Sequence, residues 1–196
     1  MVKKILLAVA VLVALFAVYV ALQPARYRIE RTHVVAAPPE VVYDQIASFR
    51  AWERWAPWSK LDPKMAVEYG GPPSGVGATY HWKGDDKTVG EGRMKIVEAK
   101  APERILIQLD FIKPWESKAR NEFLLKPDGG GTKVAWVMSG DNDFVGKAYG
   151  VFVDMDKAVG SMFEKGLADL RAAAEAESVR AREEAAKGAP AGPPKP

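Results

Sequence analysis

Residues 151–170, VFVDMDKAVGSMFEKGLADL, decide the fold, because their apolar residues recur every three or four positions. This spacing is typical of an amphipathic helix with a single apolar stripe. We expect one long helix over residues 143–184. Its stripe consists of Val151, Phe152, Met155, Val159, Met162, Phe163, Leu167 and Leu170. Such a stripe must be buried against a second layer of structure.

Residues 27–141 supply that layer as short segments of alternating apolar and polar residues, separated by glycine- and proline-containing turns. A short helix is expected after Pro38 and Pro39, since proline is favoured in the first helical turn. The predicted fold class is α+β, with a curved antiparallel sheet of six or seven strands wrapped around the long C-terminal helix. Strands are expected at residues 27–36, 65–69, 78–83, 88–98, 104–111, 117–125 and 132–139.

Alternate residues of these strands should face the helix and form either an ordinary core or one wall of an apolar cavity. Both interpretations stay open, although two methionines and Gly160 on the stripe favour an adaptable, incompletely filled surface. The tryptophans at 52, 55 and 58 are interpreted as a packed turn. The candidate ligand-binding residues are Tyr80, Trp82, Met94, Phe111, Trp136, Phe152, Met155, Met162, Phe163 and His33.

His33 occupies an inward position of the first strand, where an apolar residue would be expected. A histidine there is usually hydrogen-bonded within the fold, and a role in proton transfer would need a polar partner such as Tyr80. The main hypothesis is a domain that binds a hydrophobic or amphipathic small molecule. An enzyme of cyclase or hydrolase type, with His33 and Tyr80 in one pocket, is the second hypothesis. A protein-interaction module is the third.

Composition excludes several other classes of protein. The chain has 196 residues and a net charge of +3, but without Lys3 and Lys4 its 28 Lys and Arg become 26, against 25 Asp and Glu. This balance, without any nucleic-acid-binding motif, argues against a nucleic-acid partner. There is no cysteine and there are only two histidines, His33 and His81. We therefore expect neither a metal site nor another cofactor.

Residues 5–22 form an uncharged run rich in Leu, Val and Ala. At about 1.5 Å per residue it spans roughly 27 Å, close to the hydrocarbon thickness of a bilayer. A cleaved signal peptide is the alternative, but the run is longer than a usual signal core and no good cleavage motif follows it. We expect a membrane anchor at residues 1–25. The soluble domain is expected on the exported side, periplasmic in a two-membrane bacterium.

Several motifs, in this order, resemble the START-like helix-grip superfamily, specifically its SRPBCC branch of polyketide cyclase/dehydrase and lipid-transport proteins. The resemblance implies a cavity beneath the long helix that binds hydrophobic molecules. It covers roughly residues 27–177, most of the soluble chain, and predicts a helix-grip domain at residues 26–177. Residues 178–196 then form a charged helical extension and a disordered tail. The motifs are RTHVVAAPPEVV (31–42), WERWAPW (52–58), GVGA (75–78), GTKVAW (131–136) and MFEKGLADL (162–170).

Overall fold

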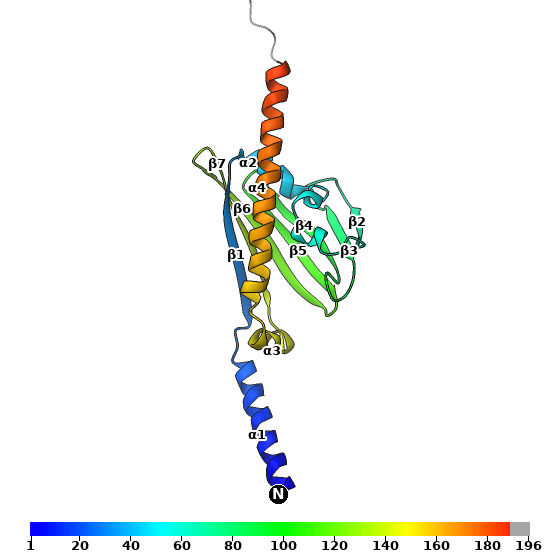
Figure 1. The fold of residues 1–196 in the computed structure, drawn as a ribbon, viewed down its shortest axis with the longest axis vertical. Helices are drawn as coiled ribbons and strands as arrows, with labels where there is room; N and C mark the ends of the chain where they lie inside the picture. The colour runs from blue at the N-terminus through cyan, green and yellow to red at the C-terminus, as the bar shows by residue number, and fades with distance from the viewer. Residues whose placement is uncertain (189–196) are drawn as a thin grey trace, which may run out of the picture.

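The computed structural model describes residues 1–188, which form an elongated molecule with helix α1 (Val2–Ala21) at one end. The long helix α4 (Met155–Gly188) runs along the sheet and projects beyond its other end (Figure 1). The other helices are α2 (Pro39–Ala47), the 3₁₀ helices η1 (Ala51–Arg54) and η2 (Pro57–Lys60), and α3 (Phe144–Phe152). The expected tail at residues 189–196 lies outside the described residues.

Seven strands form one antiparallel sheet in the order β1-β7-β6-β5-β4-β3-β2. The sheet and α4 confirm the α+β helix-grip architecture expected from the sequence. The alternation is also confirmed, since the inward positions of β5 and β7 are largely buried. The strands are β1 (Arg26–Val35), β2 (Ala66–Gly70), β3 (Thr79–Lys83), β4 (Glu91–Lys100), β5 (Arg104–Lys113), β6 (Ser117–Asp128) and β7 (Gly131–Asp141).

The single helix expected over residues 143–184 is wrong in one respect, because the chain leaves helical geometry at Val153 and Asp154. Val153 is extended, with φ −123° and ψ 121°. The carboxylate of Asp154 then accepts a hydrogen bond from the backbone N–H of Lys157 at 2.9 Å and caps the start of α4. Periodicity alone assigned Asp154 to the polar face of a continuous helix and missed this capping role.

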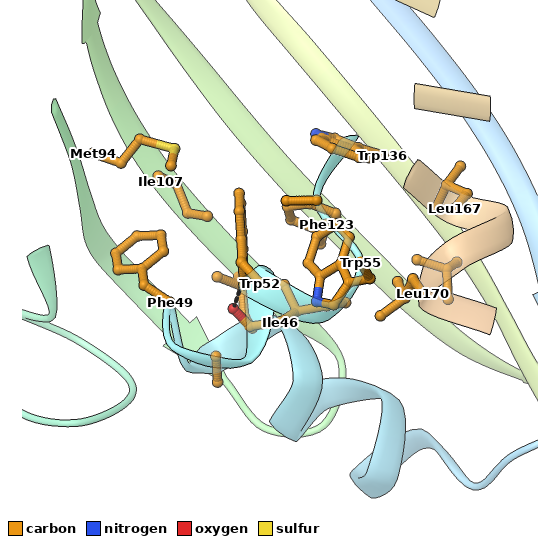
Figure 2. Packing of buried hydrophobic residues seen from close by; sticks show 14 of the residues in the cluster. Ile46, Phe49, Trp52, Trp55, Met94, Ile107, Phe123, Trp136, Leu167 and Leu170 are labelled. Atoms are coloured by element: carbon orange, nitrogen blue, oxygen red, sulfur yellow. Dashed lines mark hydrogen bonds between the residues drawn. The ribbon is translucent and has the colours of Figure 1, made fainter. Parts of the chain in front are cut away.

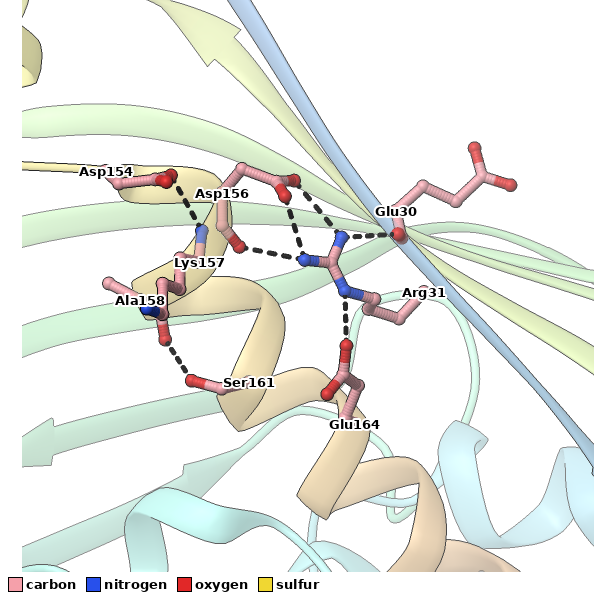
Figure 3. A network of polar contacts seen from close by, with 8 residues as sticks. All are labelled: Glu30, Arg31, Asp154, Asp156, Lys157, Ala158, Ser161 and Glu164. Carbon is pink, nitrogen blue, oxygen red and sulfur yellow. Dashed lines mark hydrogen bonds and ion pairs between the residues drawn. The ribbon is translucent and has the colours of Figure 1, made fainter.

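Arg31 ties β1 to the first turns of α4 (Figure 3). Its guanidinium donates to Glu164 at 2.8 Å, to Asp156 at 2.9 Å and to the backbone carbonyl of Glu30 at 2.9 Å. A Cβ at Gly160 would lie 2.0 Å from this guanidinium, so glycine leaves the space that Arg31 occupies. Arg31, a second polar residue on the inner face of β1, therefore holds α4 in position on the sheet.

The Arg31–Asp156 pair should make stability depend on pH. Hydrogen bonding to Arg31 holds the pKa of the Asp156 carboxyl below its usual range. Such a group stabilises the fold above its unfolded-state pKa, and this contribution is lost as the pH falls through its folded-state pKa. Asp156→Asn should therefore lower the unfolding temperature at about pH 7, and this effect should become smaller as the pH falls towards about 2.

Thermal unfolding of the detergent-solubilised chain between these two pH values checks the expectation. Asp86→Asn, in the exposed turn between β3 and β4, is the control and should change little at any pH. If Asp156→Asn lowers the unfolding temperature by the same amount at every pH, the electrostatic explanation is contradicted.

Aromatic side chains fill the concave face of the sheet beneath α4 (Figure 2). Trp136 stacks on Phe163 with ring centroids 4.0 Å apart. The indole N–H groups of Trp52 and Trp55 donate to the backbone carbonyls of Ile46, at 2.9 Å, and Gln45, at 3.1 Å. Trp52 and Trp55 are thus packed into the core, as the interpretation of a packed turn expected, whereas Trp58 is only partly buried against it. The centre of the grip is occupied by the protein's own side chains.

Candidate functional site

A hollow of about 380 Å³ lies beside this aromatic core, between the 3₁₀ helices and the edge of the sheet at β2 and β3. Small-molecule sites commonly have volumes of about 300–1,000 Å³, so this hollow is at the lower end of that range. Its apolar lining consists of Trp52, Ala56, Trp58, Met65, Val67 and Tyr80, and Tyr69 adds a further aromatic ring. We call it the η2 pocket.

The local sequence explains how these side chains converge. β2 alternates, so Met65, Val67 and Tyr69 share one face and are half-buried, whereas the residues between them are exposed. Tyr69 lies opposite Tyr80 in the β2–β3 register, and their rings are 5.6 Å apart. Pro57 opens η2, which places Trp58 across the pocket from this strand pair.

Tyr69 in the pocket lining has two polar neighbours. The hydroxyl of Tyr69 donates to the carboxylate of Glu53 at 2.5 Å, and the Arg50 guanidinium lies 4.4 Å from the centre of the Tyr69 ring. Burial, followed by the hydrogen bond to Glu53, raises the pKa of Tyr69. Burial, with the charge of Glu53 as a smaller cause, raises the pKa of Tyr80 to about 12. Both phenols therefore stay neutral and can hydrogen-bond to a ligand's polar end.

Two further contacts hold the outer wall of the pocket in place. Lys60 at the end of η2 pairs with Asp169 of α4 at 2.8 Å. The carboxylate of Asp62 accepts hydrogen bonds from the backbone N–H groups of Lys64 and Asp85, each at 2.9 Å. These hydrogen bonds lower the pKa of Asp62. Lys60 thus joins η2 to α4, and Asp62 joins the loop after η2 to the β3–β4 turn.

The sequence-derived candidate residues are only partly brought together. Tyr80 lines the η2 pocket. Trp82 and Met94 are buried next to it, since the ring of Trp82 is 6.0 Å from that of Tyr80 and Met94 pairs with Tyr80 across β3 and β4. Trp136 and Phe163 belong to the packed core. Phe111 is half-buried against Trp82.

The helical candidates lie elsewhere. Met162 is half-buried on α4, and Met155 at its start is exposed. Phe152 is 76% exposed at the end of α3, and its ring is 6.1 Å from that of Phe16 in α1 rather than over the sheet. Ligand binding by these residues stays a prediction.

His33 does not reach the η2 pocket. It pairs with Val134 at the β1 side of the sheet and lies near Glu175 of α4. The sheet order separates β1 from β3 by five strand spacings, roughly 24 Å along the sheet. The geometry therefore gives no support to catalysis by His33 and Tyr80 in one pocket.

Sequence reasoning missed Trp58, Met65, Val67, Tyr69 and Glu53 as pocket residues. The sequence does contain a signal for three of them, because Met65, Val67 and Tyr69 alternate with other residues and so form an apolar face of the strand.

Two buried polar atoms on the inner face of the sheet have no hydrogen-bond partner among the described residues. They are Oδ1 of Asn121 and Nε1 of Trp136. A buried group of this kind costs about 1–3 kcal/mol when it is left unpaired. Neither residue lines the η2 pocket. The two atoms are therefore an unpaired acceptor and an unpaired donor inside the grip and do not belong to that site.

Comparison with known families identifies the family of the domain. Residues 26–175 match the family described as polyketide cyclase / dehydrase and lipid transport. The chain belongs to this family. The resemblance seen in the sequence is thereby confirmed, and the polyketide cyclase/dehydrase and lipid transport family supports a domain that binds hydrophobic ligands. A search of curated proteins found no match.

Solved structures of similar fold include protein CV1439 from Chromobacterium violaceum, with a TM-score of 0.55, 19% identity, and coverage of 78% of this chain and 98% of that chain. The Aha1 dimer from Colwellia psychrerythraea has a TM-score of 0.55 and 17% identity over 76% of this chain and 96% of that one. Mll3558 from Rhizobium loti has a TM-score of 0.54 and 19% identity over 76% and 96%. At these identities the likeness shows the helix-grip fold alone.

Proposed function

We propose that the protein is a membrane-tethered binding or carrier domain for a hydrophobic or amphipathic, lipid-like small molecule that occupies the η2 pocket. The observation that carries this proposal is the largely apolar pocket of about 380 Å³ with the hydrogen-bonded Tyr69–Glu53 pair in its lining. Apolar walls with a few placed polar groups are the usual composition of small-molecule sites. Membership of a family that includes lipid-transport proteins supports the same class of ligand.

The size and polarity of the pocket restrict the class of ligand that fits. Its volume is near the lower limit for ligand sites, which suits a single acyl chain or a fused ring system better than a two-chain phospholipid. Glu53 and Asp62 both contribute carboxylates to the lining, and Lys60 is already paired with Asp169. A neutral or cationic polar end therefore fits this site better than an anionic one.

Filling the pocket should weaken binding. In Val67→Trp, the larger side chain would occupy the space between β2 and η2, and the affinity should fall roughly tenfold or more, or about 1.4 kcal/mol. Ala66→Trp is the matched control, because Ala66 is exposed on the other face of the same strand. The measurement is titration with an anthroyloxy-labelled long-chain alcohol, combined with native mass spectrometry for co-purified lipid. Equal affinity in both folded variants would reject the η2 pocket as the site.

We also propose that α1 remains in the membrane and that the domain lies on the exported side. α1 is the one helix among residues 1–188 that is long and apolar enough to cross a bilayer, and almost all of its side chains are exposed. The arginines that follow it are paired with carboxylates: Arg26 with Asp141, Arg28 with Glu30, and Arg31 with Asp156. They are thus largely engaged within the domain.

The absence of native cysteine gives a clean test of this topology. Asp128→Cys lies in the exposed β6–β7 turn, at the end of the sheet away from α1 (Figure 1). It should react with a membrane-impermeant maleimide in intact spheroplasts. Labelling only after lysis would place the domain in the cytoplasm.

A further inference from the structure

Helix α3 carries an apolar face that the described part of the chain leaves uncovered. Val145, Tyr149 and Phe152 are 67%, 45% and 76% exposed. Their spacing of four and three residues places them on one side of the helix. Trp115, from the loop between β5 and β6, extends this face, since its exposed ring is 6.0 Å from that of Tyr149. We call these four residues the α3 face.

The contacts of α3 with the membrane-spanning candidate indicate what covers this face. The ring of Phe152 is 6.1 Å from that of Phe16, which lies five residues before the end of α1. At 1.5 Å per residue, this is about 7–8 Å inside the end of that helix. The Lys147 ammonium also donates to the backbone carbonyl of Ala21 at 3.0 Å. α3 is therefore held at the C-terminal end of α1, between that helix and the sheet, as Figure 1 shows.

The chain entering the domain is held at the same place. The backbone N–H of Asn142, just before α3, donates to the carbonyl of Ala25 at 2.8 Å, and the Asn142 side chain lies within 3.4 Å of the Pro24 carbonyl. The segment between α1 and β1 thus runs directly along the start of α3. A bilayer that contains α1 must reach α3 as well.

The chemistry of the α3 face matches a bilayer interface. Tryptophan and tyrosine favour the head-group region, where the ring is in apolar surroundings and the polar group stays hydrated. The more apolar Val145 and Phe152 suit the boundary with the acyl chains, as in helices that lie in the plane of the interface. Lys147 adds a basic group next to the end of α1, where it also complements the helix dipole.

We propose that the α3 face lies in the interfacial layer of the same phospholipid bilayer that α1 spans, so that the domain is docked on the membrane surface and does not hang from a free tether. This inference rests on the proposed anchoring by α1. It adds a second contact, and it sets the sheet with the α3 end towards the lipid and the β6–β7 turn away from it.

Nitroxide labels on the full-length protein test this in vesicles of phosphatidylcholine with a minor fraction of phosphatidylglycerol. Three single-cysteine variants are needed: Val145→Cys on the α3 face, Leu12→Cys in α1 and Asp128→Cys in the distal turn. Relaxation by oxygen, which concentrates in lipid, is compared with relaxation by a water-soluble nickel chelate. We expect the labels at 12 and 145 to favour oxygen, and the label at 128 to favour nickel by several-fold.

Each other outcome overturns a defined part of the proposal. A label at 145 that is as accessible to nickel as the label at 128, with the label at 12 still in lipid, refutes the docking and leaves the anchor intact. A nickel-accessible label at 12 refutes the anchor and the docking together. A label at 145 that is immobilised and shielded from both reagents shows that a protein surface, such as a second copy, covers the α3 face. The η2 pocket contains none of these positions, so the Val67→Trp result is independent.

Discussion

Trp136→Ala is expected to lower the free energy of unfolding by about 3–5 kcal/mol. Trp136 is fully buried, stacks on Phe163 at 4.0 Å, and has its ring centroid within 4.9 Å of Phe123 and 5.7 Å of Trp55. Removing the indole would leave a cavity at the centre of the grip, and the surrounding rings can close it only in part. Denaturant unfolding of the detergent-solubilised chain, followed by far-ultraviolet circular dichroism, measures the loss.

The matched control is Trp115→Ala, because Trp115 is 61% exposed and should contribute within about 0.5 kcal/mol in detergent. A loss below about 1 kcal/mol for Trp136→Ala would contradict the packing described for this region. It would mean that the space beneath α4 is not filled by aromatic side chains and that a ligand cavity there should be considered again.

Gly92→Val is expected to destabilise the domain by about 2–3 kcal/mol and to weaken ligand binding in the η2 pocket. A Cβ at this position would lie 2.4 Å from the Trp82 ring and 2.8 Å from the backbone carbonyl of Asp110. The indole cannot simply move away, because its N–H donates to the carbonyl of Val89 at 2.9 Å. Displacing Trp82 would also disturb the neighbouring Tyr80, whose side chain lines the pocket.

Gly150→Ala in α3 is the control, since a Cβ there would meet no atom within 4 Å. It should be neutral or stabilising by up to about 1 kcal/mol, because alanine is the better helix former. Thermal unfolding and the probe titration together check both variants. Unchanged stability of Gly92→Val would show that the sheet accommodates a branched side chain against Trp82.

The fold was largely predictable because strand alternation and helix periodicity are both set by burial. The strand of residues 104–111 shows this well, since Ile105, Ile107 and Leu109 face the core as expected. The break between α3 and α4 was not predictable from periodicity. The apolar residues on either side of Asp154 have helical spacing, and the interruption is seen in the extended backbone of Val153 and in the capping hydrogen bond from Lys157. Capping signals should therefore be read together with the apolar stripe.

The site was less predictable, because burial does not distinguish a pocket wall from packed core. Trp136 and Tyr80 both occupy inward strand positions, yet Trp136 is enclosed by other rings and Tyr80 opens onto a hollow. The difference comes from the tryptophans of residues 52–58, which fold back into the grip and fill its centre. Only their three-dimensional placement shows that the remaining space lies beside η2.

The position of β1 in the sheet has a consequence for biogenesis. Among residues 1–188, β1 is an edge strand whose one partner is β7, so that Arg26 lies opposite Asp141 and Val35 opposite Thr132. A ribosome adding roughly 5–20 residues per second needs on the order of 5–20 s to make the intervening chain. Strands β2 to β6 can meanwhile pair as neighbours, whereas β1 must wait for β7. Because β1 follows α1 directly, an inserted anchor would hold this waiting strand beside the membrane, and closure of the sheet would be the late, non-local step of folding.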